Sequence, residues 1–345
     1  MKAISILVTK TLTVPQLVLV AFLATIPPIA AEDLGLARGT AIASAAVPLS
    51  ATALVFAQYP IPALQGIAPW IANPLLLGTH VPMYWLNPGR AAWYTGAGLV
   101  LPAAGIGLMA GVGSPLALEW SGTLLGAYSN LMLFSAYDTS LQSRQHLPSE
   151  FAGYLPADSP LVDDRRLLRL AAAPFTEVVA DPLVWAPSII APALLTGWYL
   201  LFESEGTQSV GSTGTSFVAD TPVAPVAGGA YALAKGAIDI LAISVGEEAY
   251  YRGVLYDAVQ REYGRTTARV TDAILFPLVH LPTDISQGLK PETMVFNFAW
   301  RAAMTLVFDA AYDKGGLPLS IATHFWSDLV LVMSRWWFYG GATRI

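Results

Sequence analysis

The longest apolar run of the chain constrains its fold most strongly, because it carries charged side chains in its middle. The run extends from about residue 227 to 259 and contains Glu247, Glu248 and Arg252. A charged residue at the centre of a membrane helix costs about 2.5–3.5 kcal/mol, so such residues pair or face a bundle interior or a wet cavity. We therefore predict a long helix whose charged positions face protein or water and not lipid.

The two neighbouring glutamates of this run are not equivalent on a helix. Glu248 and Arg252 are four residues apart and share a face, as do Lys235 and Asp239. Glu247 points about 100° away from Glu248. The spacing predicts ion pairs Lys235–Asp239 and Glu248–Arg252, and it leaves Glu247 as the carboxylate that the arginine does not neutralise.

The composition extends this membrane interpretation to the whole chain. Only 12% of the 345 residues are charged and 54% are hydrophobic, whereas soluble domains carry roughly 25% charged residues. We predict an all-α fold, a polytopic transmembrane bundle of about eight helices. The net charge of −6 argues against nucleic-acid binding and leaves membrane lipids as expected partners. Cysteine is absent, which excludes disulfides and cysteine catalysis.

Polar stretches divide the chain into four parts. Residues 1–31 resemble a signal peptide or a first membrane helix. Residues 32–202 form an N-terminal membrane region whose arginine-rich loop, at about 137–180, is predicted to be cytoplasmic. Residues 203–228, rich in Gly, Ser, Thr and Pro, predict an extracytoplasmic loop, and 229–339 form the C-terminal core. The N-terminal apolar segments lie at roughly 40–58, 66–85, 91–112, 115–136 and 185–202.

The C-terminal core carries two further polar clusters besides the glutamates. Its apolar segments lie at about 229–260, 270–283, 293–312 and 317–339. The second contains Phe276-x-x-x-His280, and the fourth contains His324-x-x-x-Asp328, whose spacing places imidazole and carboxylate on one helix face. Ionisable groups inside apolar helices are candidates for function.

Each cluster also has a purely structural explanation. Glu248 and Arg252 could be a structural ion pair, His280 a core histidine, and His324 with Asp328 a hydrogen bond between helices. We expect three further charged residues to be interfacial or paired and assign them no chemistry: Arg301, Asp309 and Asp313. It is the joint occurrence of the clusters that favours catalysis.

The three clusters, in this order, resemble the motifs of the CAAX protease and bacteriocin-processing (CPBP, or Abi) family of intramembrane endopeptidases, in particular the CAAX prenyl protease 2 type. Glu247-Glu248-x-x-x-Arg252, with Tyr251 and Gly253 beside the arginine, is similar to the first motif. The two histidine clusters are similar to the second and third, and Gly315-Gly316-Leu317-Pro318 resembles the turn before the last histidine. The resemblance covers about residues 229–335 and implies a four-helix catalytic core.

The resemblance also implies a role for each motif residue and a substrate class. Glu247 would act as the general base that activates water, together with His280. His324, assisted by Asp328, would stabilise the oxyanion. Glu248 and Arg252 would be the supporting pair. The substrate would be a hydrophobic or lipidated peptide. Asp328 departs from the asparagine that would be a natural donor here, and an ionised carboxylate only accepts hydrogen bonds. We expect Asp328 to orient or charge His324, or to be protonated.

Zinc is the mechanistic rival, since Glu247, Glu248, His280 and His324 are potential ligands. We expect no cofactor, because no His-x-x-x-His face exists and Arg252 beside Glu248 disfavours a cation. Two other functions stay open: a non-proteolytic immunity or scaffold protein of the same fold, and a proton-coupled transporter. The signal-like start and absent cysteines favour a multi-pass protein of a prokaryotic plasma membrane.

Overall fold

The computed structural model describes residues 31–57, 166–202, 216–218, 221–286 and 289–339, together with Trp120, Thr123, Ala127 and Tyr137. The predictions for residues 1–30 and for the segments at about 66–85, 91–112 and most of 115–136 lie outside these residues. The described parts form two compact units, one from Met1–Pro88 with Val254–Thr305 and the other from Gly89–Gly253 with Leu306–Ile345. We call them unit 1 and unit 2.

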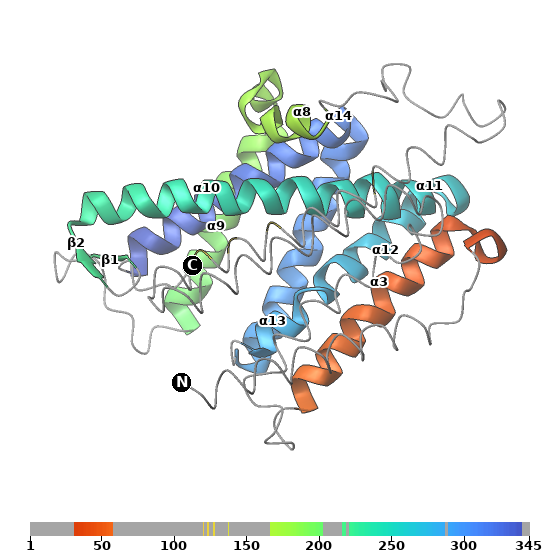
Figure 1. Cartoon of the computed structure of the whole chain (residues 1–345), viewed down its shortest axis with the longest axis horizontal. Helices are drawn as coiled ribbons and strands as arrows, with labels where there is room; N and C mark the ends of the chain where they lie inside the picture. Colours follow the sequence, from red (N-terminus) through yellow and green to blue (C-terminus); the bar gives the residue numbers. More distant parts are fainter. Residues whose placement is uncertain are drawn as a thin grey trace, which may run out of the picture. The chain divides into compact units, whose positions relative to one another are not determined.

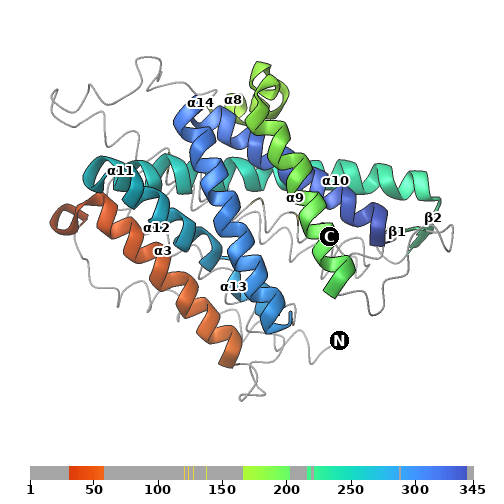
Figure 2. The ribbon, with the colours of Figure 1, turned by 180° about the vertical axis from the view of Figure 1, so that it is seen from behind.

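Unit 1 is built from short helices around α3 (Ala31–Ala57). Helices α11 (Asp257–Tyr263), α12 (Arg265–Leu278) and α13 (Leu281–Ser286) each contact α3, and α3 runs beside α12 in both views (Figures 1 and 2). Gly264 separates α11 from α12 with φ 85°, a left-handed conformation that favours glycine. Helices α12 and α13 correspond to the short, proline-interrupted segment expected at about 270–283.

Unit 2 begins with short helical turns and continues into two long helices. These are α8 (Arg166–Ala172), the 3₁₀ turns η4 (Ala173–Phe175) and η5 (Glu177–Ala180), α9 (Pro182–Phe202) and α10 (Pro225–Tyr250). Helix α10 starts at Pro225 after the extended Ala224, which suits a residue that lacks an N–H donor. Between α9 and α10, strands β1 (Ser216–Val218) and β2 (Thr221–Val223) pair antiparallel, so the region predicted as a loop contains a short hairpin.

Two features of the C-terminal helices shape unit 2. A π-helical turn, η7 (Tyr251–Tyr256), directly follows α10, and such turns are frequent at functional sites. Helix α14 (Pro291–Tyr339) is interrupted at Gly316, whose φ of 67° and ψ of −163° are not helical. The predicted segments at 293–312 and 317–339 are thus two arms of one bent helix, and the first arm reaches unit 2 from Leu306 onward.

The apolar helices support an integral membrane protein. Within the described residues, Val226–Tyr263 and Pro291–Ser334 are long and apolar enough to cross a membrane. A third span results if the helices on either side of Asp181, bent by 96°, count as one. The predicted total of about eight membrane helices includes segments that the structure does not describe.

Candidate active site

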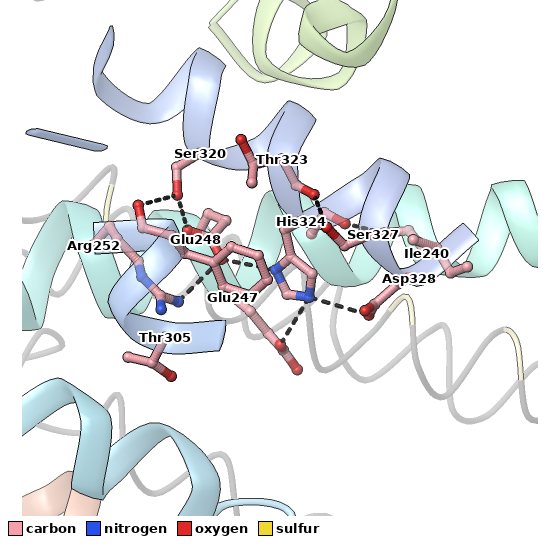
Figure 3. A network of polar contacts seen from close by, with 12 residues as sticks. Ile240, Glu247, Glu248, Arg252, Thr305, Ser320, Thr323, His324, Ser327 and Asp328 are labelled. Atoms are coloured by element: carbon pink, nitrogen blue, oxygen red, sulfur yellow. Dashed lines mark hydrogen bonds and ion pairs between the residues drawn. The ribbon is translucent and has the colours of Figure 1, made fainter. Parts of the chain in front are cut away.

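A buried polar cluster lies in unit 2, where the C-terminal end of α10 meets both arms of α14. Figure 3 shows that its side chains come from α10, the π-helical turn η7 that follows it, and α14, which is far away in the sequence. The two helices also share an apolar contact nearby, where Ile240 of α10 packs with Phe325 and Leu329 of α14. This packing holds the polar side chains of both helices close together.

Glu248 is the centre of the cluster and is completely buried. Its Oε1 accepts a hydrogen bond from Arg252 at 3.0 Å and faces His324 Nδ1 at 2.8 Å. Its Oε2 accepts a hydrogen bond from the Ser320 hydroxyl. A carboxylate can accept about four hydrogen bonds, so three donors leave Glu248 little capacity to take a proton from water. Glu248 therefore orients the groups around it.

Arg252 lies between two carboxylates and is also completely buried. Besides its bond to Glu248, its Nε donates to Asp309 Oδ1 at 3.2 Å. The guanidinium carbon lies 5.2 Å from the centroid of the Phe308 ring, a cation–π distance. The predicted Glu248–Arg252 ion pair is confirmed, and so is the pair Lys235–Asp239, at 2.6 Å.

His324 connects the buried carboxylate to the partly exposed ones. Its Nδ1 faces Glu248, and its Nε2 lies 3.2 Å from Asp328 Oδ2 and 3.9 Å from Glu247 Oε2. Figure 3 shows the imidazole between Glu248 on one side and the other two carboxylates on the other. The ring also stacks on Phe308, with centroids 4.6 Å apart. Both ring nitrogens can donate to carboxylates at once only when the ring is protonated.

Glu247 occupies a different environment from its neighbour. Its side chain is 14% exposed, whereas that of Glu248 is 0% exposed. The distance of 3.9 Å to His324 is too long for a hydrogen bond. Asp328 is more open still, with 40% of its side chain exposed. Of the two motif glutamates, Glu247 is thus the one that is partly exposed, and the imidazole lies beside it.

Gly253, next to the arginine, makes room for an aromatic ring. A Cβ atom at this position would lie 2.5 Å from the Tyr137 ring. This close approach explains why a glycine follows Arg252. The Tyr137 ring therefore packs against the backbone next to Arg252.

His280 belongs to unit 1 and is described with that unit. It lies just after α12, where its backbone N–H donates to Pro277 and its ring meets Phe276 edge-on at 5.2 Å. The predicted site residues of unit 2 (Glu247, Glu248, Arg252, His324 and Asp328) are brought together. The part that His280 plays stays a prediction.

Three members of the cluster were missed as site residues by the sequence reasoning: Phe308, Asp309 and Ser320. Asp309 was expected to be interfacial or paired; it is paired, yet completely buried in the cluster. A carboxylate in the middle of an apolar segment was the available signal. Ser320 and Phe308 carry no such signal, because serine and phenylalanine are common in membrane helices.

No group of three His, Cys, Asp or Glu side chains suited to a metal ion occurs among the described residues. The cluster is that of unit 2, and His280 belongs to unit 1. The donors around Glu248 already occupy both of its oxygens.

The apolar helices support an integral membrane protein, and the cluster gathers buried and partly exposed ionisable groups within it. Residues 229–330 match the family of type II CAAX prenyl endopeptidases described as Rce1-like. Over these residues the match agrees with the family that the motifs resemble, and it supports a membrane protease. Searches of curated proteins and of solved structures gave no match.

Proposed function

We propose that the protein is an intramembrane endopeptidase that hydrolyses a peptide bond of a membrane-associated or lipidated peptide with water activated by Glu247 and histidine. The observation that carries the proposal is the division of labour between the two glutamates. Both oxygens of Glu248 already face donors, whereas Glu247 is partly exposed and lies beside the His324 imidazole.

In the proposed reaction, Glu247 takes a proton from a water molecule that attacks the scissile carbonyl. His324 donates from Nε2 toward the oxygen on which negative charge develops, and a preorganised donor of this kind is worth several kcal/mol of barrier. Glu248 holds Nδ1 at 2.8 Å and fixes the orientation of the ring. Asp328 accepts from Nε2 in the absence of substrate and favours the charged ring. We assign His280 to holding the water, from the motif alone.

The test is a Glu247→Gln variant, purified with the wild type in detergent or nanodiscs. The probes are a farnesylated peptide with a three-residue tail after the modified cysteine and the same peptide without the lipid. Removal of a general base lowers kcat by roughly 10²–10⁴-fold. Glu292→Gln is the matched control, because Glu292 is an exposed glutamate in the first turn of α14. A Glu247→Gln enzyme that cleaves at the wild-type rate would overturn the proposal.

The same variant separates the protease from a scaffold of the same fold. In cells, comparison of the membrane peptides of wild-type and Glu247→Gln strains should reveal an uncut peptide in the variant. A scaffold needs the protein and not the carboxylate, so a normal phenotype at normal protein level would favour the scaffold. We further propose a multi-pass location in a prokaryotic plasma membrane, which fractionation of the native host would test.

A further inference from the structure

The buried charges of the cluster do not balance within the motif alone. Arg252, Glu248 and Asp309 are all completely buried. The two carboxylates outnumber the single guanidinium, so this trio carries one negative charge when ionised. His324, 3% exposed and 2.8 Å from Glu248, is the cation that balances it when its ring is protonated. Among the completely buried groups, Asp309 thus supplies the negative charge that offsets a protonated His324 beside the neutral Glu248–Arg252 pair.

Asp309 also fixes the orientation of the guanidinium. Glu248 and Arg252 lie on consecutive turns of one helical stretch, whereas Asp309 comes from the first arm of α14. Glu248 accepts a hydrogen bond from Arg252 Nη1 at 3.0 Å, and Asp309 accepts one from Arg252 Nε at 3.2 Å. Because the guanidinium is planar and its N–H groups form a rigid fork, two acceptors on different nitrogens determine its plane.

The residue before Asp309 reinforces this arrangement. The Phe308 ring stacks on His324 at an interplanar angle of 16° and lies under the Arg252 guanidinium. Ser320, whose hydroxyl donates to Glu248, also lies 3.1 Å from the Phe308 carbonyl oxygen. Consecutive residues of α14 therefore contact both cations of the cluster.

We propose that Asp309 is a positioning residue for the peptidase reaction, which acts through Arg252 and Glu248 to hold the His324 ring. This rests on the proposed function. Without Asp309, Arg252 loses the acceptor that its Nε meets, and the plane of the guanidinium is less firmly fixed. Glu248 then loses the fixed donor at Oε1, where it also meets His324 Nδ1. The ring that presents Nε2 to the substrate is displaced as a result.

Two substitutions of Asp309 separate the charge from the hydrogen bond. Asp309→Asn keeps an acceptor for Arg252 Nε and removes the charge, whereas Asp309→Ala removes both. A displacement of about 1 Å costs roughly 100-fold in rate, so we expect Asp309→Ala to lower kcat by about ten- to a hundredfold and Asn by less. KM should stay within about twofold, because Asp309 is buried away from any substrate. Asp313→Asn, one turn further along α14, is the control and should retain wild-type kcat.

A double variant tests whether Asp309 acts through the arginine. In an Arg252→Met background, the further substitution Asp309→Asn should leave kcat unchanged, since the connection is already broken. An additional loss as large as the one in the wild type would contradict an action through Arg252.

A spectroscopic measurement tests positioning without any substrate. The ring ¹⁵N signals of His324, assigned by their absence in His324→Gln, should move in Asp309→Asn and stay in place in Asp313→Asn. Unchanged His324 signals in a folded Asp309→Asn protein would overturn the proposal whatever the kinetics. Shifted signals in a protein that cleaves none of the probes would uphold the positioning and refute the peptidase function.

Discussion

The two neighbouring glutamates should differ sharply in what they contribute to stability. Glu248→Ala removes the acceptor of Arg252, His324 and Ser320 from a site with no exposed surface. Breaking a buried ion pair costs about 3–5 kcal/mol. Asp309 still accepts from Arg252 Nε, so we expect the lower end, about 3 kcal/mol.

Glu247→Ala should cost far less. Its carboxylate is partly exposed, and its distance to His324 is beyond hydrogen-bond length. We expect a loss of about 1 kcal/mol or less, the range of substitutions that break no buried network. Both variants should be inactive, so activity alone does not distinguish the two residues.

Thermal unfolding in detergent distinguishes them. The ten tryptophans of the chain supply an intrinsic fluorescence signal. For a chain of this size, 1 kcal/mol corresponds to about 2 °C in Tm, so the expected decreases are about 6 °C for Glu248→Ala and about 2 °C or less for Glu247→Ala. Equal decreases, or a Glu248→Ala protein as stable as the wild type, would refute the assignment of Glu248 as the buried centre of the network.

Four further predictions concern the surroundings of the cluster. Asp328→Asn removes the charge that faces His324 Nε2 and should lower kcat by at least about tenfold; an unchanged rate would rule out a required carboxylate. Gly316→Ala forces a side chain into the backbone conformation of the bend and should cost about 1–3 kcal/mol, measured as a decrease in Tm. The hydrogen bond from Lys314 lowers the pKa of Asp181 in the folded protein. The stability that this carboxylate contributes is therefore complete above the ordinary Asp pKa of about 3.9 and is lost as the pH falls through the lower, folded pKa. Asp181→Asn should reduce the difference in Tm between about pH 6 and about pH 3. Activity should survive a chelator, and its loss with rescue by zinc would overturn the metal-free mechanism.

Local spacing made half of the cluster predictable. Residues four apart on a helix lie on one face whatever the rest of the chain does. Within the cluster, the pairs Glu248–Arg252 and His324–Asp328 follow from this rule, and so does Lys235–Asp239 outside it. The two arms of α14 were likewise visible, because Gly315-Gly316 interrupts an otherwise apolar pattern.

The remaining contacts depend on tertiary packing that no local pattern contains. Asp309 is 57 residues from Arg252 in the sequence, and Ser320 is 72 residues from Glu248. The π-helical turn at Tyr251–Tyr256 changes the helical period just after the glutamates, so regular periodicity does not predict which face meets α14. The hairpin of β1 and β2 was missed because a stretch rich in Gly, Ser and Thr predicts a loop.

The segment before the family-matched region bears on the geometry of the site, because it contacts both arms of α14. Val184 of α9 forms one apolar cluster with Ala311 of the first arm and with Leu319 and Ala322 of the second. The first arm supplies Phe308 and Asp309 to the cluster, and the second supplies Ser320, His324 and Asp328.

The polar contacts of the same segment fall on both sides of the bend. Lys314, just before Gly316, pairs with Asp181 at 2.6 Å. Trp326, on the second arm, donates from its ring nitrogen to Pro174 at 2.9 Å. The angle between the arms sets how Asp309 and His324 meet the glutamates, and a segment held to both arms restrains that angle. We therefore expect that the geometry of the site depends on the bend at Gly316 and on the N-terminal segment packed against it.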